Sequence, residues 1–289
     1  MWGGPQIARL PDGRLHLQHG PIDLIIQAWG ATAEVEAAER QAIERFGDVL
    51  ETLVGELTLL RTPLTETPSG LRGSVARRMA AAVWPYRDVY ITPMAAVAGA
   101  VADTILEAML AGRTLAKAYV NNGGDIAFHL APGEEVRTAV VVNPSAPALD
   151  AVAVLQADMP VRGIATSGWR GRSFSLGIAD AATVFAADAA AADAAATIVG
   201  NAVNVDHPAI RRAPASSLRD DTDLDELLVT TAVEKLPSDA IAAALDGGAA
   251  KARELQARGL IWGAGVSLQG QWRLVMPVDP ILSRLNPAS

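Results

Sequence analysis

Apolar residues along the chain recur in two patterns, one typical of helices and one typical of strands. Over residues 32–60 they return at intervals of three, four or seven, which predicts one amphipathic helix beginning at Thr32. Pro, Gly and polar residues bound further helical patterns. These predict helices over residues 74–83, 92–112, 188–203 and 237–258, the last weakening at Gly247-Gly248.

β-rich runs lie between these helices in blocks and do not alternate with them one by one. The runs are residues 22–27, 116–120, 125–130, 137–142, 152–156, 162–166, 182–185, 227–233, 261–268 and 271–276. Blocks of strands with helices between them favour an α+β class with mixed or antiparallel sheet regions and packed helices. We expect a single domain over residues 1–289, in two lobes around a ligand cleft, with an exposed polar excursion over residues 207–224.

Composition narrows the classes of function. The chain has no cysteine and only four histidines, which excludes disulfides and thiolate sites and disfavours a multi-histidine metal centre. A net charge of −8 argues against nucleic acid as a partner. No basic leader precedes an apolar run, and the apolar run around residues 94–101 is too short to span a bilayer, so we expect a cytoplasmic protein that does not bind a membrane.

The first candidate motif, Asn121 to Asp125, contains two consecutive glycines between two strands. Asn and Gly supply the positive φ angles of a tight hairpin, so one interpretation is a simple turn. The alternative is a binding turn, because glycines let the backbone approach a ligand and offer N–H groups to it. The sequence leaves both interpretations open.

The second candidate motif is a loop rich in Gly, Ser and Arg over residues 166–175. Its hydroxyls and N–H groups could contact phosphate oxygens, with an arginine as a bidentate donor. The alternative is a hairpin loop with solvated arginines and a packed Trp169. The candidate ligand-binding residues here are Thr166, Ser167, Gly168, Arg170, Arg172 and Ser173.

The third candidate is Asp193 with Thr197, which lie four residues apart and so project from one face of the predicted helix. Oxygen ligands of this kind suit Mg²⁺, which completes its shell with water and phosphate. The alternative is a solvated aspartate and a threonine bonded to its own backbone. Asp180, near the preceding strand, is a cap, a turn residue or a second ligand.

The order of these motifs resembles the ApbE-like superfamily, whose best-known members are FAD:protein FMN transferases. The resemblance rests on Asn122-Gly123-Gly124-Asp125-Ile126, Ile164-Ala165-Thr166-Ser167-Gly168 and Ala192-Asp193-Ala194-Ala195-Ala196-Thr197. It covers mainly residues 90–205 and looks closer to an uncharacterised branch than to the transferases.

The resemblance implies that Asp193 and Thr197 bind Mg²⁺ and that the glycine turn (Asn122, Gly123, Gly124, Asp125) and the 166–175 loop line FAD. It also implies phosphoester transfer, in which the metal ion neutralises charge on the pyrophosphate. The transferases carry a histidine after the Thr-Ser-Gly strand, whereas residues 175–180 here contain none. We therefore expect either that Asp180 serves as the catalytic acid–base group or that this branch does different chemistry.

Two alternatives to an FMN transferase-like enzyme remain open at this stage. One is a protein that binds a flavin or another nucleotide without transferring it, and the other is an enzyme acting on a different small anionic metabolite. A transferase would need an acceptor protein as partner. The Gly/Ala-rich helix around residues 94–101 could serve a homo-oligomer interface as easily as a core.

Overall fold

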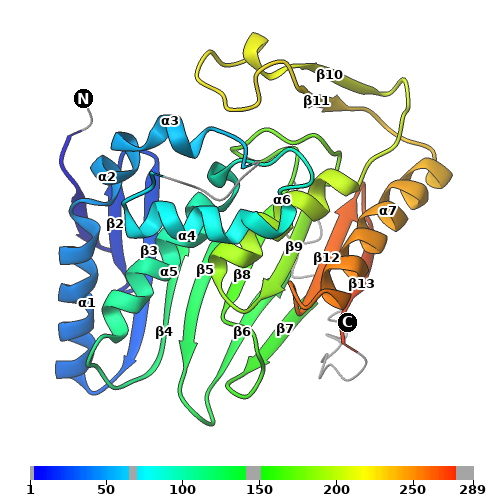
Figure 1. Ribbon diagram of the computed structural model, residues 1–289. Helices are drawn as coiled ribbons and strands as arrows, with labels where there is room; N and C mark the ends of the chain where they lie inside the picture. The colour runs from blue at the N-terminus through cyan, green and yellow to red at the C-terminus, as the bar shows by residue number, and fades with distance from the viewer. Residues whose placement is uncertain (1–2, 65–69, 141–150, 278–289) are drawn as a thin grey trace. The chain divides into compact units, whose positions relative to one another are not determined.

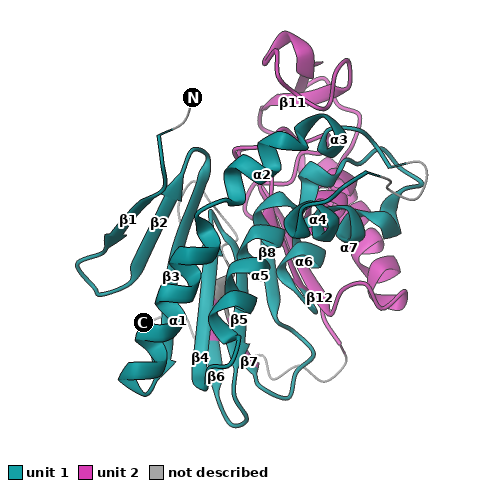
Figure 2. Ribbon diagram, turned by 60° about the vertical axis from the view of Figure 1, so that its left-hand side comes forward, with its two compact units in different colours: residues 1–136, 156–165, 186–194 teal, residues 137–155, 166–185, 195–289 magenta. Residues whose placement is uncertain are grey.

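The computed structural model describes residues 3–64, 70–140 and 151–277 and divides the chain into two compact units. The first unit contains residues 1–136, 156–165 and 186–194, and the second contains residues 137–155, 166–185 and 195–289 (Figure 2). Each unit therefore combines stretches that are far apart in sequence. The predicted single domain with a ligand cleft between two lobes stays a prediction.

An antiparallel sheet forms one layer of the first unit, with the strand order β1-β2-β3-β4-β5-β8 (Figure 1). The strands are β1 (Gln6–Arg9), β2 (Leu15–His19), β3 (Ile22–Gly30), β4 (Leu115–Asn122), β5 (Asp125–Leu130) and β8 (Gly163–Ser167), whose last two residues belong to the second unit. Along β3, the buried residues Ile22, Leu24 and Ile26 alternate with partly exposed ones. This period of two directs one face of the sheet toward the helices.

The helices of the first unit are α1 (Thr32–Phe46), α2 (Val49–Gly55), α3 (Leu57–Leu60), α4 (Ser74–Val83) and α5 (Val97–Leu110), together with the start of α6 (Ala189–Ala202). The prediction of one helix over residues 32–60 is wrong, because the chain breaks twice. Gly47 and Asp48 separate α1 from α2, and Glu56, with a φ of −114°, separates α2 from α3. Glycine and aspartate have low helix propensity, which favours a break in the helix at this point. The apolar residues keep their helical spacing on both sides of the break, so the spacing alone does not reveal it.

The helix α5 is the centre of this unit. Thr92 caps the preceding 3-10 helix η2 (Pro93–Ala96) by accepting the N–H of Met94, and Pro93 occupies the first position of that helix. The stretch Pro93–Leu110 has a mean hydropathy of 1.4 over 18 residues, long and apolar enough to cross a membrane by length and composition alone. Because 61% of it is buried and α5 packs on α1, α4, β4 and β5, it behaves as a core helix.

The second unit contains β9 (Ala181–Ala186, without its last residue), β12 (Gly263–Leu268) and β13 (Gln271–Val275), in that order and antiparallel. The helix α7 (Ser238–Ala257) packs on β12 and β13. It runs without interruption, so the predicted weakening at Gly247-Gly248 is wrong. A Cβ on Gly248 would overlap the side chain of Val203, which shows that this glycine serves close packing inside an intact helix.

Two further strand pairs form separate two-stranded sheets. Residues 207–224, predicted as an exposed excursion, contain β10 (Ile210–Pro214), which pairs with β11 (Leu228–Val233). The sequence did not predict β10, because its polar residues and prolines resemble a loop. The other pair is β6 (Glu135–Val140) with β7 (Ala151–Gln156), and residues 141–142 of the predicted strand lie outside the described part. The predicted α+β class is confirmed.

Two glycines let α5, α6 and β8 approach one another within the first unit. A Cβ on Gly99 would overlap the carbonyl oxygen of Ala189, and a Cβ on Gly163 would overlap the carbonyl group of Asp188. Backbone therefore lies against backbone at the start of α6. Only a residue without a side chain fits at either position, because a backbone obstacle cannot rotate away as a side-chain tip can.

We predict that Gly99→Ala lowers the free energy of unfolding by about 1–3 kcal/mol through this overlap. The matched control is Gly55→Ala at the end of α2, where an added Cβ meets nothing within 4 Å. That change should be neutral or stabilise by up to about 1 kcal/mol, because alanine is the better helix former. Urea unfolding measures the free energy of unfolding of both variants. If Gly99→Ala were as stable as Gly55→Ala, the close approach of Gly99 to the backbone of Ala189 would be contradicted.

Candidate functional site

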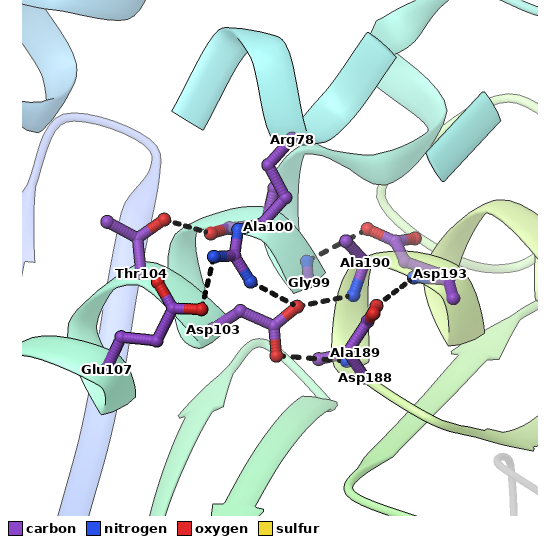
Figure 3. A network of polar contacts seen from close by, with 11 residues as sticks. Arg78, Gly99, Ala100, Asp103, Thr104, Glu107, Asp188, Ala189, Ala190 and Asp193 are labelled. Carbon is purple, nitrogen blue, oxygen red and sulfur yellow. Dashed lines mark hydrogen bonds and ion pairs between the residues drawn. The ribbon is translucent and has the colours of Figure 1, made fainter. Parts of the chain in front are cut away.

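Each of the helices α5 and α6 supplies an aspartate that caps the N-terminus of the other (Figure 3). Asp193 of α6 accepts the N–H of Gly99, in the first turn of α5, at 3.0 Å. Asp103 of α5 accepts the N–H groups of Ala189 and Ala190, in the first turn of α6, at 3.0 and 2.9 Å. The first N–H groups of a helix have no partner inside the helix and carry partial positive charge, so both carboxylates lie at favourable positions.

Asp103 is buried, with 6% of its surface exposed. Its two oxygens are divided between the two α6 N–H groups, and the guanidinium of Arg78 lies 3.6 Å away. Arg78 also pairs with the exposed Glu107. Burial raises the pKa of Asp103 to about 6, helped by the negative charge of Asp188 and opposed by the N–H donors and Arg78. Desolvation therefore outweighs the favourable contacts.

Asp193 keeps part of its surface exposed. Its surroundings raise its pKa well above the usual range of a carboxyl group, mainly through loss of solvation and next through the negative charge of Asp125. The N–H groups of Gly99 and Ala98 act in the opposite direction. Asp193 is thus a carboxylate with donors on one side and a second carboxylate nearby.

The hairpin of β4 and β5 brings the predicted glycine turn to the same helix end. The amide nitrogen of the buried Asn122 side chain donates to the carbonyl oxygen of Ala98 at 3.1 Å. Gly123 and Gly124 have φ angles of +66° and +115°, and the N–H of Gly124 donates to the Asn121 side chain at 2.8 Å. This geometry is that of a tight turn, whose second role in binding stays a prediction.

The first unit thus brings together Asn122, Asp125 and Asp193 from the predicted site. Among the described residues, no group of three or more His, Cys, Asp or Glu side chains could hold a metal ion. A pair of carboxylates still fits Mg²⁺, which usually takes one or two protein carboxylates and completes its octahedron with water and phosphate. Zinc and other ions that need three or four nitrogen or sulfur ligands fit the site poorly.

The predicted loop and Asp180 lie in the second unit, where Asp180 holds the loop in place. One Asp180 oxygen accepts the indole N–H of Trp169 at 3.2 Å, and the other accepts the N–H of Gln269 at 2.6 Å. The Arg170 guanidinium lies 3.5 Å from Asp180 and stacks over the Trp169 ring. With three donors around it, Asp180 has the surroundings of a turn-fixing residue, and its catalytic role stays a prediction.

The remaining predicted ligand residues also belong to the second unit. The Thr166 hydroxyl lies 2.9 Å from the Thr183 hydroxyl, and a Cβ on Gly168 would overlap the carbonyl oxygen of Asp180. Arg172 and Ser173 are exposed in the loop, whereas Ser167 is partly buried. Thr197 follows Asp193 by one turn of α6 and is partly exposed. Their roles as ligands stay predictions.

Sequence reasoning missed the residues that hold Asp193 in place, namely Asp103, Arg78 and Gly99. One signal was present: Asp103 is the one acid in the apolar first half of α5, between Ala102 and Thr104. Lone carboxylates inside buried helices are usually paired or hydrogen-bonded. The partners, however, come from α6 and α4, which no local pattern connects to α5.

The shifted pKa of Asp103 predicts a dependence of stability on pH. Between about pH 4 and pH 6 the folded state binds more protons at Asp103 than the unfolded state does, so this residue's contribution to the free energy of unfolding falls as pH rises. From a normal pKa of 3.8 to about 6, the fall is up to about 3 kcal/mol. Unfolding of wild type and Asp103→Asn across this range measures it, since the asparagine cannot ionise. A stability difference that does not vary with pH would contradict the prediction.

Relatives of known sequence include several archaeal proteins named UPF0280 protein. The protein from Methanosarcina acetivorans is 36% identical over 182 residues, covering 62% of this chain and 68% of the relative. The protein from Methanosphaerula palustris is 36% identical over 179 residues, covering 61% and 70%. That from Methanothrix thermoacetophila is 41% identical over 119 residues, covering 40% of this chain and about half, 48%, of the relative.

Two solved structures of flavin transferases cover most of the chain at low similarity. The apo form of the flavinyl transferase ApbE from Pseudomonas stutzeri matches with 11% identity and a TM-score of 0.36, over 94% of this chain and 96% of that one. A mutant of the flavin transferase ApbE from Vibrio cholerae matches with 14% identity and a TM-score of 0.35, over 87% and 77%.

A family model described as AbpE bacteria matches residues 7–274, which is nearly the whole chain. The resemblance to an uncharacterised ApbE-like branch, carried in the sequence by three short motifs, is confirmed by this match and by the UPF0280 relatives. The chain therefore belongs to the AbpE bacteria family.

Proposed function

We propose that this protein binds the flavin nucleotide FAD together with Mg²⁺ and acts as an enzyme related to the flavin transferases. The observation that carries the proposal is the carboxylate of Asp193, which is held at the N-terminus of α5 with Asp125 as a negative neighbour. Loss of solvation and a like charge both disfavour its ionised form. A divalent cation beside Asp193 would relieve both, because it supplies positive charge next to the carboxylate.

The donor set of this end of the unit supports Mg²⁺. Two N–H groups occupy only part of the acceptor capacity of the Asp193 carboxylate, which has about four lone-pair sites. When bound, the ion would neutralise charge on a pyrophosphate and so assist phosphoester transfer. The N-terminus of α5 adds partial positive charge at the same place, which favours a phosphate group. Thr197 keeps the role of second ligand that the resemblance implies.

A second candidate, a flavin-binding protein without transferase activity, is favoured by one specific observation. Residues 173–180 contain no histidine, and Asp180, the one ionisable side chain in this stretch, is engaged by Trp169, Gln269 and Arg170. Loss of a general acid–base group typically lowers a rate by about 10²–10⁴-fold. A transferase of this kind would be slow, and it would need an acceptor protein with a hydroxyl group.

The binding proposal predicts a shift of the melting temperature when FAD and Mg²⁺ are added together. The informative variant is Asp193→Asn, which keeps an oxygen for the N–H of Gly99 but removes the charge. We expect it to fold and to bind FAD in the presence of Mg²⁺ on the order of tenfold or more weakly than wild type. Its affinity in EDTA should be unchanged.

The matched control is Glu107→Gln, which changes an exposed acid of the same network that pairs with Arg78. It should bind as wild type does. Wild-type protein that shows no shift with FAD and Mg²⁺ would contradict the proposal, and so would Asp193→Asn protein with unchanged affinity.

The transferase and the binding protein differ in one product. Transfer of FMN to an acceptor hydroxyl cleaves the pyrophosphate of FAD and releases AMP, so chromatography of the nucleotides distinguishes the two candidates. We expect AMP to form only with Mg²⁺ and an acceptor protein present. Tight binding of FAD with no AMP above the rate of the Asp193→Asn variant, across a panel of acceptor proteins, would favour the binding protein.

A further inference from the structure

Asp103 cannot itself serve as a ligand-binding group. Only 6% of its surface is exposed, and its oxygens accept the N–H groups of Ala189 and Ala190 while Arg78 lies 3.6 Å away. A ligand would have to displace two helix N–H groups to reach it. Burying a carboxylate in the protein interior is nevertheless unfavourable, so we expect a structural role for Asp103.

The geometry shows what the two hydrogen bonds of Asp103 do to α6. They hold the N–H groups of two successive residues in the first turn. This sets the position of α6 along its own axis and its rotation about that axis. Asp193 follows Ala189 by four residues, or about one turn and 6 Å, and so lies on nearly the same side of the helix. A small rotation or slide of α6 would therefore carry the Asp193 carboxylate away from Gly99.

We propose that Asp103 is a positioning residue for Asp193: through the first turn of α6 it holds the Asp193 carboxylate at the end of α5 in the orientation that receives a ligand. Arg78 assists from α4 by pairing with Asp103, and the close approach at Gly99 brings the two helix ends within reach of each other's aspartates. The ligand in this inference is the Mg²⁺–FAD pair, so this part rests on the proposed function.

The effect on local structure can be measured without any ligand. In Asp103→Ala, the N–H groups of Ala189 and Ala190 lose their acceptor, so hydrogen exchange at these positions accelerates. The proposal adds that Gly99 exchanges faster as well, although Asp103 makes no hydrogen bond to it, because its acceptor Asp193 moves with α6. The amide of Val120, in the β4–β5 ladder, is the internal reference and should exchange as in wild type.

The effect on binding uses three variants at a temperature where all are folded. We expect Asp103→Ala to weaken Mg²⁺-dependent FAD binding by about 10–100-fold, the range typical of residues that orient a metal ligand. Asp103→Asn, which keeps one acceptor oxygen, should restore part of this loss, and Glu107→Gln should have wild-type affinity. If Asp103→Ala does not fold, Asp103→Asn carries the test, with a weaker effect in the same direction.

The outcomes separate the two proposals. Faster exchange at Gly99 with no FAD binding by wild type would support the coupling of Asp103 to Asp193 and overturn the proposed function. FAD binding by wild type with unchanged affinity in both Asp103 variants would overturn the positioning role and leave the proposed function intact. Unchanged exchange at Gly99 in Asp103→Ala would also overturn the positioning role.

Discussion

The structure of the first unit depends on one constraint: two helices begin next to each other inside the protein, and neither can leave its first N–H groups without partners. A buried N–H group without an acceptor costs about 1–3 kcal/mol, and a buried carboxylate without donors costs more. The two helices meet both demands together, because Asp103 of α5 caps α6 and Asp193 of α6 caps α5. Each hydrogen bond gives a buried N–H group an acceptor and a buried carboxylate a donor, which reduces both costs.

This arrangement is not symmetrical, and the difference bears on function. Asp103 is enclosed, paired with Arg78 and committed to two N–H groups, which is the environment of a structural carboxylate. Asp193 is partly exposed, and the negative charge of Asp125 raises its pKa, which is the environment of a carboxylate that gains from a cation. Of the two capping aspartates, Asp103 thus has a structural role and Asp193 is the candidate metal ligand.

Local patterns predicted most elements of the fold. The helix over residues 74–83 and the hairpin of β4 and β5 follow the sequence closely, because apolar spacing and turn residues act within a few residues. The prediction of one helix over residues 32–60 is wrong for a local reason. The apolar residues keep their helical spacing through Gly47 and Glu56, although the helix ends at both places. At Gly247-Gly248 the opposite holds, since tight packing against Val203 overrides the low helix propensity of glycine.

The candidate site was predictable only in part. Motif resemblance led to Asn122, Asp125 and Asp193, and the structure brings these three together in the first unit. It could not lead to Asp103 or Arg78, whose partners are 86 and about 25 residues away in sequence. Asp180 shows the converse limit, because a sequence cannot reveal that a carboxylate is already bonded to a tryptophan, a backbone N–H group and an arginine.

The most direct test of the central claim is a crystal structure of the protein grown with FAD and Mn²⁺, in which anomalous scattering locates the ion. We expect an anomalous peak at coordinating distance, about 2.0–2.3 Å, from the carboxylate of Asp193, with FAD bound next to the ion. An ion peak elsewhere, or FAD bound with no ion near Asp193, would contradict it.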